Sequence, residues 1–568
     1  MQYSRTTLAA SVAALLLTGS PALAARGTDG DVKILFWQAV SNLNPYLSGG
    51  SKESYAASMV IEPLAGFDEN GNIVPRLVTE IPTVENGGIS KDLRSITWKL
   101  DPKITWSDGS KFTAEDVIFT WQYCMAPGGG CAQRAKFDGI SSITAPDPQT
   151  VKITFDTPRP YPYTAFVGAL APVLQKAQFK DCLGALAAQC TAANFGPIGT
   201  GPFVVTDFKA NDVINFKANP HYRDPAKPAF ATATLKGGGD AISAARAVLE
   251  TSEYDFAWNT VIEPEVVEAM TKKGKGTLTS AFSSTVERIL LNPYAVNASL
   301  GDKRSTKEAG PHPALSDPQV RRALALAIDR DAIVEVGYGK TGTPTCNIIP
   351  APEIYASTAK EWCNKPDIAA ANALLDKAGW VKGPDGIRVK NGVKLSLLFQ
   401  TTTNSVRQTT QTLIKDMWSQ IGVETELRNV SASVFFGGDV ASPDTYQKFY
   451  ADVEMFASGF ESTDPEKFMT DFKCDKIPTP QTGWQGQNSA RYCSPEYDAL
   501  VDKLRTTAGL ENRAAIIRTL NDMIVNDGLV IPLVNRGEPS AISNTLKDAK
   551  LNPWDSQLWN VADWSRAK

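Results

Sequence analysis

The stretch Trp106-Ser107-Asp108-Gly109-Ser110-Lys111-Phe112-Thr113-Ala114-Glu115-Asp116-Val117 places a tight turn directly before the start of a helix. Ser107-Asp108-Gly109 predicts the turn, because aspartate and glycine tolerate the backbone conformations that turns require. Thr113 stands three residues before Asp116, in a pattern related to the capping box, and an apolar helix face follows from Val117 onward. This part of the chain therefore predicts a buried helix that begins at a defined residue.

Further helical and strand-like segments lie on both sides of this stretch. Upstream, residues 96–106 alternate apolar and polar side chains around Asp101-Pro102, which predicts a β-hairpin. Downstream, Asp317-Pro318 and Asp464-Pro465 predict two helix starts, each with an aspartate N-cap and a proline in the first turn. Other helices are expected at 369–378, 408–420, 496–504 and 513–525, and strands at 32–37, 151–155, 213–217, 395–399 and 530–534. Because strands and helices mix without strict alternation, the fold class is expected to be α/β, mixed with α+β.

The composition of the 568-residue chain is that of an average globular protein, with 43% hydrophobic and 21% charged residues. At roughly 150 residues per domain, this length allows about three or four domains. The formal net charge of −4 gives no overall attraction to nucleic acid or to an anionic membrane surface. After the N-terminal segment no run approaches the roughly 18 apolar residues of a transmembrane helix, which excludes a polytopic membrane protein.

The N-terminal segment has the pattern of an export signal. Arg5 precedes an apolar run at about residues 8–17, and Ala22-Leu23-Ala24 matches the A-x-A cleavage pattern, so cleavage is expected after Ala24. A membrane anchor is the alternative, but about ten apolar residues are too few to cross a bilayer. No cysteine follows the apolar run, so a lipid-modified N-terminus is not indicated.

Eight cysteines fall into four pairs that are close in sequence: Cys124 and Cys131, Cys182 and Cys190, Cys346 and Cys363, Cys474 and Cys493. Zinc sites prefer C-x₂₋₄-C spacing, which does not occur here. In an exported chain, paired cysteines favour disulfides. Four local disulfides are therefore predicted.

Catalytic signatures are weak. The chain has two histidines, His221 and His312, both in loop-like surroundings, and it lacks the G-x-S-x-G, H-E-x-x-H and Walker A patterns. Glycines 337, 339 and 342 spell G-x-G-x-x-G, but they follow a predicted helix instead of a strand, so a helix C-cap and a loop are favoured. Paired carboxylates of a secreted hydrolase remain possible, although no spacing selects a pair. No catalytic residue, cofactor or metal ligand is predicted.

Several motifs, taken together and in order, resemble the extracytoplasmic solute-binding proteins of family 5, which serve oligopeptide, dipeptide and nickel-type ABC importers. The most specific of them is the block 106–117 quoted above. The others are Asn44-Pro45, Glu62-Pro63-Leu64, Gly71-Asn72-Ile73-Val74-Pro75-Arg76-Leu77, Gly199-Thr200-Gly201-Pro202-Phe203, Asn219-Pro220-His221-Tyr222, Asp317 to Arg330, Asp464-Pro465 and Pro495-Glu496-Tyr497-Asp498. The resemblance spans nearly all of the chain after the export signal.

This resemblance implies a periplasmic-binding-protein-like type II clamshell with an extra inserted domain. The first domain would comprise residues 26–67, 198–283 and 528–568, the inserted second domain 68–197, and the third 284–527. Cargo would lie between the first and third domains. The resemblance also implies a periplasmic monomer that does not itself span the membrane, and that delivers cargo to the transmembrane subunits of a cognate ABC permease.

The resemblance also nominates cargo-binding residues. Glu461 lies just ahead of Asp464-Pro465, where family members that bind peptides carry the partner of the ligand's ammonium group. Dipeptide binders carry an arginine before the helix expected from about residue 408, whereas this chain has polar residues that include Gln400 and Thr401. The remaining candidates are the possible cleft residues Trp258, Asn259, Trp484, Asn488 and Arg536. A solvated loop position is the alternative for Glu461, and a core position is the alternative for Trp258.

The favoured interpretation is therefore the binding component of an importer for a peptide or peptide-like solute. The same fold could instead bind a non-peptide cargo, namely an amino acid–sugar conjugate or opine, an oligosaccharide or a metal chelate. A secreted peptidase is the more distant alternative, and the chain is not expected to be an enzyme.

Overall fold

The computed structural model describes residues 26–567 except 360, 364, 440 and 461. The helices are α1 (Ser51–Ala57), α2 (Ala114–Met125), α3 (Lys176–Phe179), α4 (Thr191–Phe195), α5 (Ala241–Leu249), α6 (Pro264–Thr271), α7 (Pro318–Leu326), α8 (Arg330–Gly337), α9 (Ile368–Lys377), α10 (Ser405–Ser419), α11 (Ala432–Phe435), α12 (Glu466–Thr470), α13 (Pro495–Thr506) and α14 (Leu510–Asp527). The strands are β1 (Asp31–Phe36), β2 (Ala65–Phe67), β3 (Ile73–Pro75), β4 (Ser95–Lys99), β5 (Ile140–Asp147), β6 (Thr150–Phe155), β7 (Phe203–Lys209), β8 (Val213–Ala218), β9 (Thr232–Gly237), β10 (Phe256–Trp258), β11 (Gly276–Leu291), β12 (Gly342–Pro344), β13 (Val381–Lys382), β14 (Arg388–Lys390), β15 (Val393–Lys394), β16 (Ser396–Thr402), β17 (Glu424–Val430), β18 (Val453–Ser458), β19 (Val530–Ser543), β20 (Leu546–Lys547) and β21 (Ser565–Arg566). Helices and strands mix as the sequence predicts.

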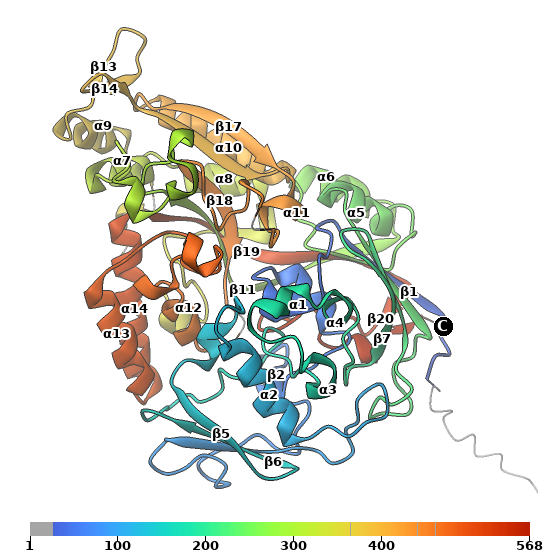
Figure 1. The fold of residues 1–568 in the computed structure, drawn as a ribbon. Coiled ribbons are helices and arrows are strands. Elements are labelled where there is room, and N and C mark those ends of the chain that lie inside the picture. The colour runs from blue at the N-terminus through green and yellow to red at the C-terminus, as the bar shows by residue number, and fades with distance from the viewer. Residues whose placement is uncertain (1–25, 360, 364, 440, 461, 568) are drawn as a thin grey trace, which may run out of the picture.

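One 11-stranded mixed sheet runs through the molecule in the order β17-β16-β18-β11-β19-β10-β1-β9-β8-β7, with β12 also paired to β19. The antiparallel strands β11 and β19 lie at the centre of this order and are far longer than their neighbours (Figure 1). Their first shared segment joins 276–282 to 537–543, and their second joins 286–291 to 530–535, with an irregularity between Phe282 and Val286. The two strands therefore connect two halves of the sheet.

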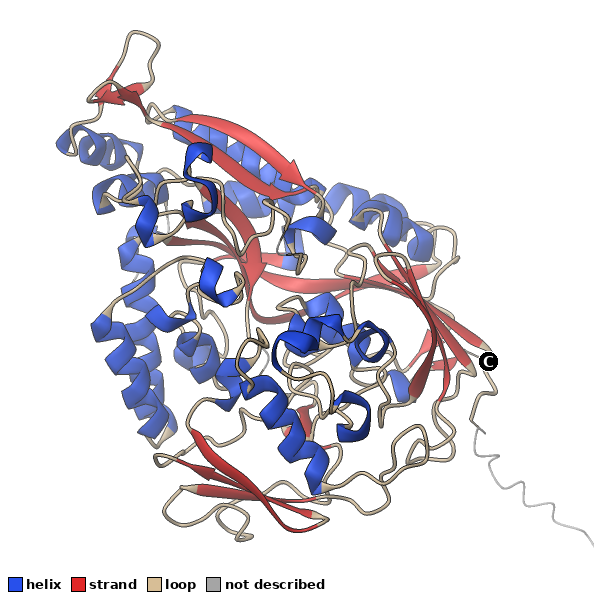
Figure 2. Ribbon diagram, in the orientation of Figure 1, coloured by secondary structure: helices blue, strands red, loops and turns tan. Residues whose placement is uncertain are grey.

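We call the sheet half formed by β1 and β7–β10, with its helices, the first lobe, and the half formed by β16–β18, with its helices, the second lobe. A separate three-stranded sheet of order β4-β6-β5 lies apart from the central sheet, at the lower edge of Figure 2. Its apolar face shares one hydrophobic core with the first lobe, in which Trp98 and Ile153 join Ile34 and Phe36. The two lobes and the β4–β6 sheet give the chain the arrangement of a clamshell; the domain boundaries given above remain a prediction.

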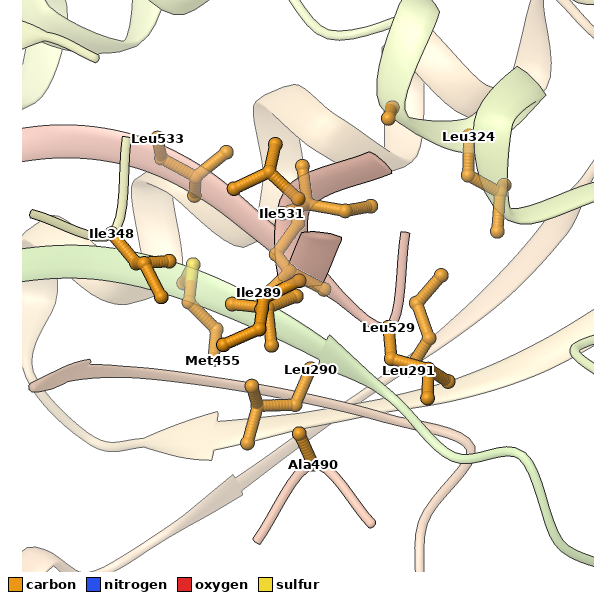
Figure 3. Packing of buried hydrophobic residues seen from close by; sticks show 14 of the residues in the cluster. Ile289, Leu290, Leu291, Leu324, Ile348, Met455, Ala490, Leu529, Ile531 and Leu533 are labelled. Atoms are coloured by element: carbon orange, nitrogen blue, oxygen red, sulfur yellow. The ribbon is translucent and has the colours of Figure 1, made fainter. Parts of the chain in front are cut away.

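The second lobe has its own core, built where β11, β18 and β19 lie side by side. Figure 3 shows Ile289, Leu290 and Met455 packed with residues of β19 and its flanking loop. The stretch 283–291 of β11 is buried throughout, as is typical of a central strand that is covered on both faces. Any charged residue in this stretch must therefore find a partner inside the protein or serve another purpose.

Local signals identify most element starts correctly, with two corrections. The Thr113–Asp116 capping box forms at the start of α2, and Asp317 caps α7 by accepting the backbone N–H of Gln319 at 2.9 Å. The predicted hairpin at 96–106 is wrong, because β4 pairs with β6 from residues 150–155. Asp464 is also not an N-cap in front of a helical Pro465, since α12 begins at Glu466 with Pro465 as its N-cap.

The structure joins the four predicted cysteine pairs as disulfides, with Cα–Cα distances of 5.2, 5.8, 5.9 and 4.6 Å from the N-terminal pair to the C-terminal pair. These Cα separations lie in the usual range for disulfides. The export signal lies outside the described residues. Across the described part of the chain, the helices are all too short or too polar to traverse a lipid bilayer.

Candidate functional site

A cavity of about 200 Å³ lies where the two lobes meet at the centre of β11 and β19. It takes its walls from both lobes and from the segment that precedes β5. Its lining residues are Gln38, Gly49, Gly50, Ser51, Tyr55, Gln133, Lys136, Leu170, Trp258, Asn259, Ser283, Thr285, Arg288, Arg407, Phe436, Tyr446, Phe456, Ala457, Ser458, Gly459, Phe460, Asp464, Lys467, Phe468, Asp471, Phe472, Gln487, Ser489, Arg536, Glu538 and Pro553. A concave site between lobes, with aromatic walls and a few convergent polar groups, is typical of a small-molecule or peptide site.

The two long strands supply polar groups to the cavity. Glu538 of β19 accepts hydrogen bonds from the Thr285 hydroxyl at 2.9 Å and from the Gln557 amide at 3.0 Å. Because Thr285 lies at the irregularity of β11 and Glu538 in the first shared segment, this bond bridges the point where the sheet halves join. The groups at this junction are therefore held in place by both long strands.

Aromatic rings form two opposing walls. On the side of the first lobe, Trp258 at the end of β10 packs against Phe36 at a centroid distance of 4.8 Å and against Tyr55 at 5.7 Å. On the side of the second lobe, Tyr446 and Phe456 pack at 5.1 Å. Among the described residues, none accepts a hydrogen bond from the buried indole nitrogen of Trp258. The walls can therefore hold planar or apolar groups, and Trp258 can donate one further hydrogen bond.

A buried cluster of charges lies beside the cavity. The Arg407 guanidinium contacts both carboxylate oxygens of Glu287, at 2.7 and 3.2 Å. Arg536 approaches the same carboxylate at 3.5 Å and donates to the side-chain oxygen of Asn259 at 3.1 Å. Glu287 thus orients two arginines from different elements, and Asn259 of the first lobe is tied to the same cluster.

A second group of charges comes from α12 and the residues that flank it. Lys467 contacts Asp471 at 2.6 Å, and burial raises the pKa of Asp471 although this lysine opposes the shift. Asp464 accepts two hydrogen bonds from Arg513, at 2.8 and 2.7 Å. These carboxylates are therefore engaged within the protein.

Ion pairs join the β4–β6 side of the cleft to the second lobe. Asp138, which lies just before β5, contacts Lys476 at 2.9 Å and Arg505 at 3.5 Å. Arg159, which follows β6, contacts Glu466 of α12 at 3.2 Å. These contacts hold the two sides of the cleft together in this structure.

Gly49 also lies at the contact between the two sides. A Cβ atom at this position would lie 2.9 Å from the Tyr446 hydroxyl and 2.9 Å from the Gln487 amide nitrogen. The backbone of the first lobe therefore approaches the second lobe closely at Gly49.

Three residues nominated from the sequence meet at the cavity. Trp258, Asn259 and Arg536 all line it, although Arg536 lies far along the chain from the other two. Glu461 lies outside the described residues; its neighbours Phe460 and Asp464 both line the cavity. The binding role of all four stays a prediction.

The other nominated residues lie away from the cavity lining. Gln400 donates to buried Glu454 at 3.2 Å, and Thr401 donates to the Met455 carbonyl at 2.7 Å. Asn488 donates to the carbonyls of Phe472, Lys473 and Tyr492, at the two ends of the loop that the last disulfide closes, and Trp484 packs on Tyr450 at 5.6 Å. The same loop reaches the cavity through Gln487 and Ser489 instead.

Sequence reasoning missed Arg288, Lys467 and Asp471. Arg288 had a usable signal, because Glu287-Arg288 interrupts an apolar strand-like run at 286–291. Two adjacent charges in a buried strand require internal partners or a ligand. Lys467 and Asp471 carry no comparable signal, since a lysine and an aspartate four residues apart are common on exposed helices.

His312 stabilises the local fold through its side chain. Nδ1 of His312 accepts the backbone N–H groups of Ala314 and Leu315 at 3.0 and 2.8 Å, and its Nε2 contacts Asp452 at 2.9 Å. Within residues 26–567, apart from the four undescribed positions, no three His, Cys, Asp or Glu side chains gather as metal ligands.

The chain is similar to known proteins along most of its length. The family model described as bacterial extracellular solute-binding proteins, family 5 Middle, matches residues 72–477, which is more than half of the chain. The glutathione-binding protein GsiB of Escherichia coli O157:H7 is 25% identical over 544 residues, which cover 95% of each chain.

Two solved structures share the fold. The oligopeptide-binding protein AppA of Bacillus subtilis, in complex with a nonapeptide, has a TM-score of 0.81 at 20% identity and covers 96% of this chain and 100% of its own. NikZ of Campylobacter jejuni, in complex with Ni(L-His), has a TM-score of 0.78 at 23% identity and covers 94% and 99%. At these identities, the likeness establishes the clamshell architecture.

Proposed function

The chain belongs to the bacterial extracellular solute-binding proteins of family 5, and from this premise we propose that it captures a peptide or peptide-like solute between its lobes. It then delivers this cargo to the transmembrane subunits of an ABC permease. The family consists of binding proteins, and the same role is proposed for this chain in place of an enzymatic one. Similarity to a glutathione-binding protein and to an oligopeptide-binding fold supports a peptide cargo.

The edge of β18 is the observation that carries the peptide proposal. Ala457, Ser458 and Gly459 line the cavity at the end of this strand. The backbone pairing of β16 with β18 ends at Gln400 and Glu454, and the Thr401 hydroxyl still bonds the Met455 carbonyl. Beyond Met455, β18 has no backbone pairing with β16. An extended peptide can add to such an edge through main-chain hydrogen bonds, while side chains enter pockets with aromatic walls.

A non-peptide cargo is the second candidate. NikZ has the same fold and holds Ni(L-His), which favours a small chelate as one alternative. An opine-like conjugate or an oligosaccharide would use the aromatic walls and the polar groups in the same way. A secreted peptidase is the remaining alternative from another class.

The location and partners follow from the export signal and the family. We expect cleavage after Ala24, release into the periplasm, and action as a monomer with a cognate permease. We also retain Glu461 as the expected partner of a cationic group on the cargo. Glu461→Gln keeps the side-chain shape and removes the charge, so affinity for a cargo with an ammonium group should fall at least about tenfold.

Native mass spectrometry of protein purified from its own source, followed by thermal unfolding with candidate cargoes, tests the proposal. Peptides, including glutathione, should raise the melting temperature by mass action, because closure around cargo stabilises the folded form. A shift only with Ni(L-His), opines or oligosaccharides would replace the peptide proposal by the second candidate. Time-dependent cleavage of a peptide pool by trace amounts of the protein would instead establish the peptidase.

A further inference from the structure

Arg288 lies in the second shared segment of β11 and reaches the wall of the cavity. It is paired in register with Phe456 of β18 on one side and with Pro532 of β19 on the other. Only 5% of the residue is exposed, although it carries a guanidinium group. Burial at this level normally requires a carboxylate partner or a full set of hydrogen bonds.

Arg288 has neither of these among the described residues. Its Nε and Nη1 atoms are buried and donate no hydrogen bond, and no carboxylate forms an ion pair with the guanidinium. Arg407, in the same cavity wall, instead contacts Glu287 through two nitrogens. The neighbouring Glu287 is therefore already committed to another arginine.

Aromatic rings surround the unpaired group. The guanidinium carbon of Arg288 lies 5.7, 5.7 and 5.5 Å from the ring centroids of Phe456, Phe468 and Phe472. These rings offer cation–π attraction but no acceptor oxygen. Burial lowers the pKa of Arg288 to about 10, so the group is still a cation at neutral pH.

The acidic side chains among the described lining residues each have a partner within the protein. Asp464 is held by Arg513, Asp471 by Lys467, and Glu538 by the Thr285 hydroxyl and the Gln557 amide. Arg288 is therefore a buried cation of the cavity wall that no described carboxylate contacts within ion-pair distance. An oxyanion that enters the cavity can supply the acceptor that the protein itself lacks.

We propose that Arg288 is the anchor for a carboxylate on the cargo, so that the transported solute is an acid at the end that lies against Phe456, Phe468 and Phe472. This inference rests on the proposed function and deepens it by assigning a charge to the cargo. A peptide C-terminus and the free α-carboxylate of a γ-linked residue share this chemistry.

The test uses peptides with a free C-terminal carboxylate, their C-terminal amides, glutathione and its diester, titrated calorimetrically into the parent protein and into Arg288→Met. The parent should bind each acid at least about tenfold more tightly than its amide or ester, and Arg288→Met should lose this preference. Preference confined to glutathione over its diester would identify the α-carboxylate of the γ-linked glutamate, whereas preference for C-terminal acids in general would identify the peptide terminus. Equal binding of acids and their neutral partners to the parent would overturn the inference and leave the binding function intact.

Thermal unfolding of the cargo-free proteins separates an anchor from a structural arginine. Arg288→Met removes an unpaired buried charge, so its melting temperature should equal or exceed that of the parent. Arg330→Met is the matched control, because buried Arg330 donates to the carbonyls of Pro532 and Cys363, away from the cavity. The loss of this guanidinium should lower the melting temperature and leave cargo affinity unchanged. If no peptide binds at all, the proposed function fails, and the cargo-free comparison alone decides the role of Arg288. In that comparison, a melting temperature of Arg288→Met as low as that of Arg330→Met overturns the anchor role of Arg288.

Discussion

Replacing Asp138 by asparagine should loosen the closed cleft. The Asp138 carboxylate contacts Lys476 and Arg505 of the second lobe, and all three side chains are only 16–20% exposed. Asp138 lies beside the β4–β6 sheet, which shares its core with the first lobe, so both contacts cross the cleft. The asparagine side chain has nearly the same size as the aspartate it replaces, but it carries no charge and so loses both ion pairs.

The expected magnitude follows from the number and exposure of these pairs. At about 0.5–1 kcal/mol for each partly exposed pair, Asp138→Asn should disfavour closure by about 1–2 kcal/mol. This corresponds to a factor of about 5 to 30 in the ratio of closed to open protein. Because only the closed form holds cargo from both sides, cargo affinity should fall by the same factor, mainly through faster release.

Calorimetric titration and stopped-flow release with the identified cargo measure this change. Asp502→Asn is the control, because Asp502 contacts Lys473 at 2.7 Å and Arg505 at 3.7 Å within the second lobe and does not cross the cleft. The difference between the two variants should shrink in high salt, which screens charges that remain in contact with water. An unchanged affinity for Asp138→Asn, or an equal loss for Asp502→Asn, would refute the role of these ion pairs in closure.

Three further predictions concern stability. Asp464→Asn should cost about 2–3 kcal/mol in denaturant unfolding, because it weakens two charge-assisted hydrogen bonds of buried Arg513, which keeps Glu466 at 3.0 Å as its second partner; a loss near 1 kcal/mol would indicate a helix cap only. Burial raises the pKa of Glu454, so the folded state binds its proton more tightly than the unfolded state and stability falls as pH rises above the unfolded pKa. Glu454→Gln should therefore raise the melting temperature at pH 8 and leave it nearly unchanged near pH 4, and a variant that melts lower at pH 8 would contradict this assignment. Replacing both Cys474 and Cys493 by serine should lower stability by about 2–4 kcal/mol in the same unfolding assay while far-ultraviolet circular dichroism stays unchanged, whereas a lost spectrum would mean that this disulfide is needed for folding.

The parts of this protein that were predictable from the sequence depend on neighbours in the chain. The capping box at Thr113 and Asp116 involves residues three apart, and the four disulfides join cysteines 7 to 19 positions apart. Spacing alone carries such information, because backbone geometry determines which close residues meet. The order of the family motifs extended this local information to the clamshell fold.

The errors arose where a residue has a distant partner. The strand at 95–99 pairs with β6 instead of with the residues that follow it, and Asp464 binds Arg513, which lies 49 positions further along the chain. The cargo role of Gln400 stays a prediction, and its amide donates to Glu454 inside the second lobe. A polar residue in a sequence does not reveal whether the fold supplies its partner.

The cavity itself is determined only by the tertiary structure. Trp258 and Arg536 were predictable as candidates, yet their meeting requires β10 and β19 to lie side by side. Arg288 was visible as a charge in an apolar strand, but only the packing shows that Glu287 belongs to Arg407 and that three phenylalanines surround the guanidinium. The sequence by itself therefore determined the family, the disulfides and the local helix starts. The proposed binding chemistry depends instead on which buried charges long-range packing leaves without a partner. The physical reason is that an unpaired buried charge is unfavourable until a ligand pairs with it.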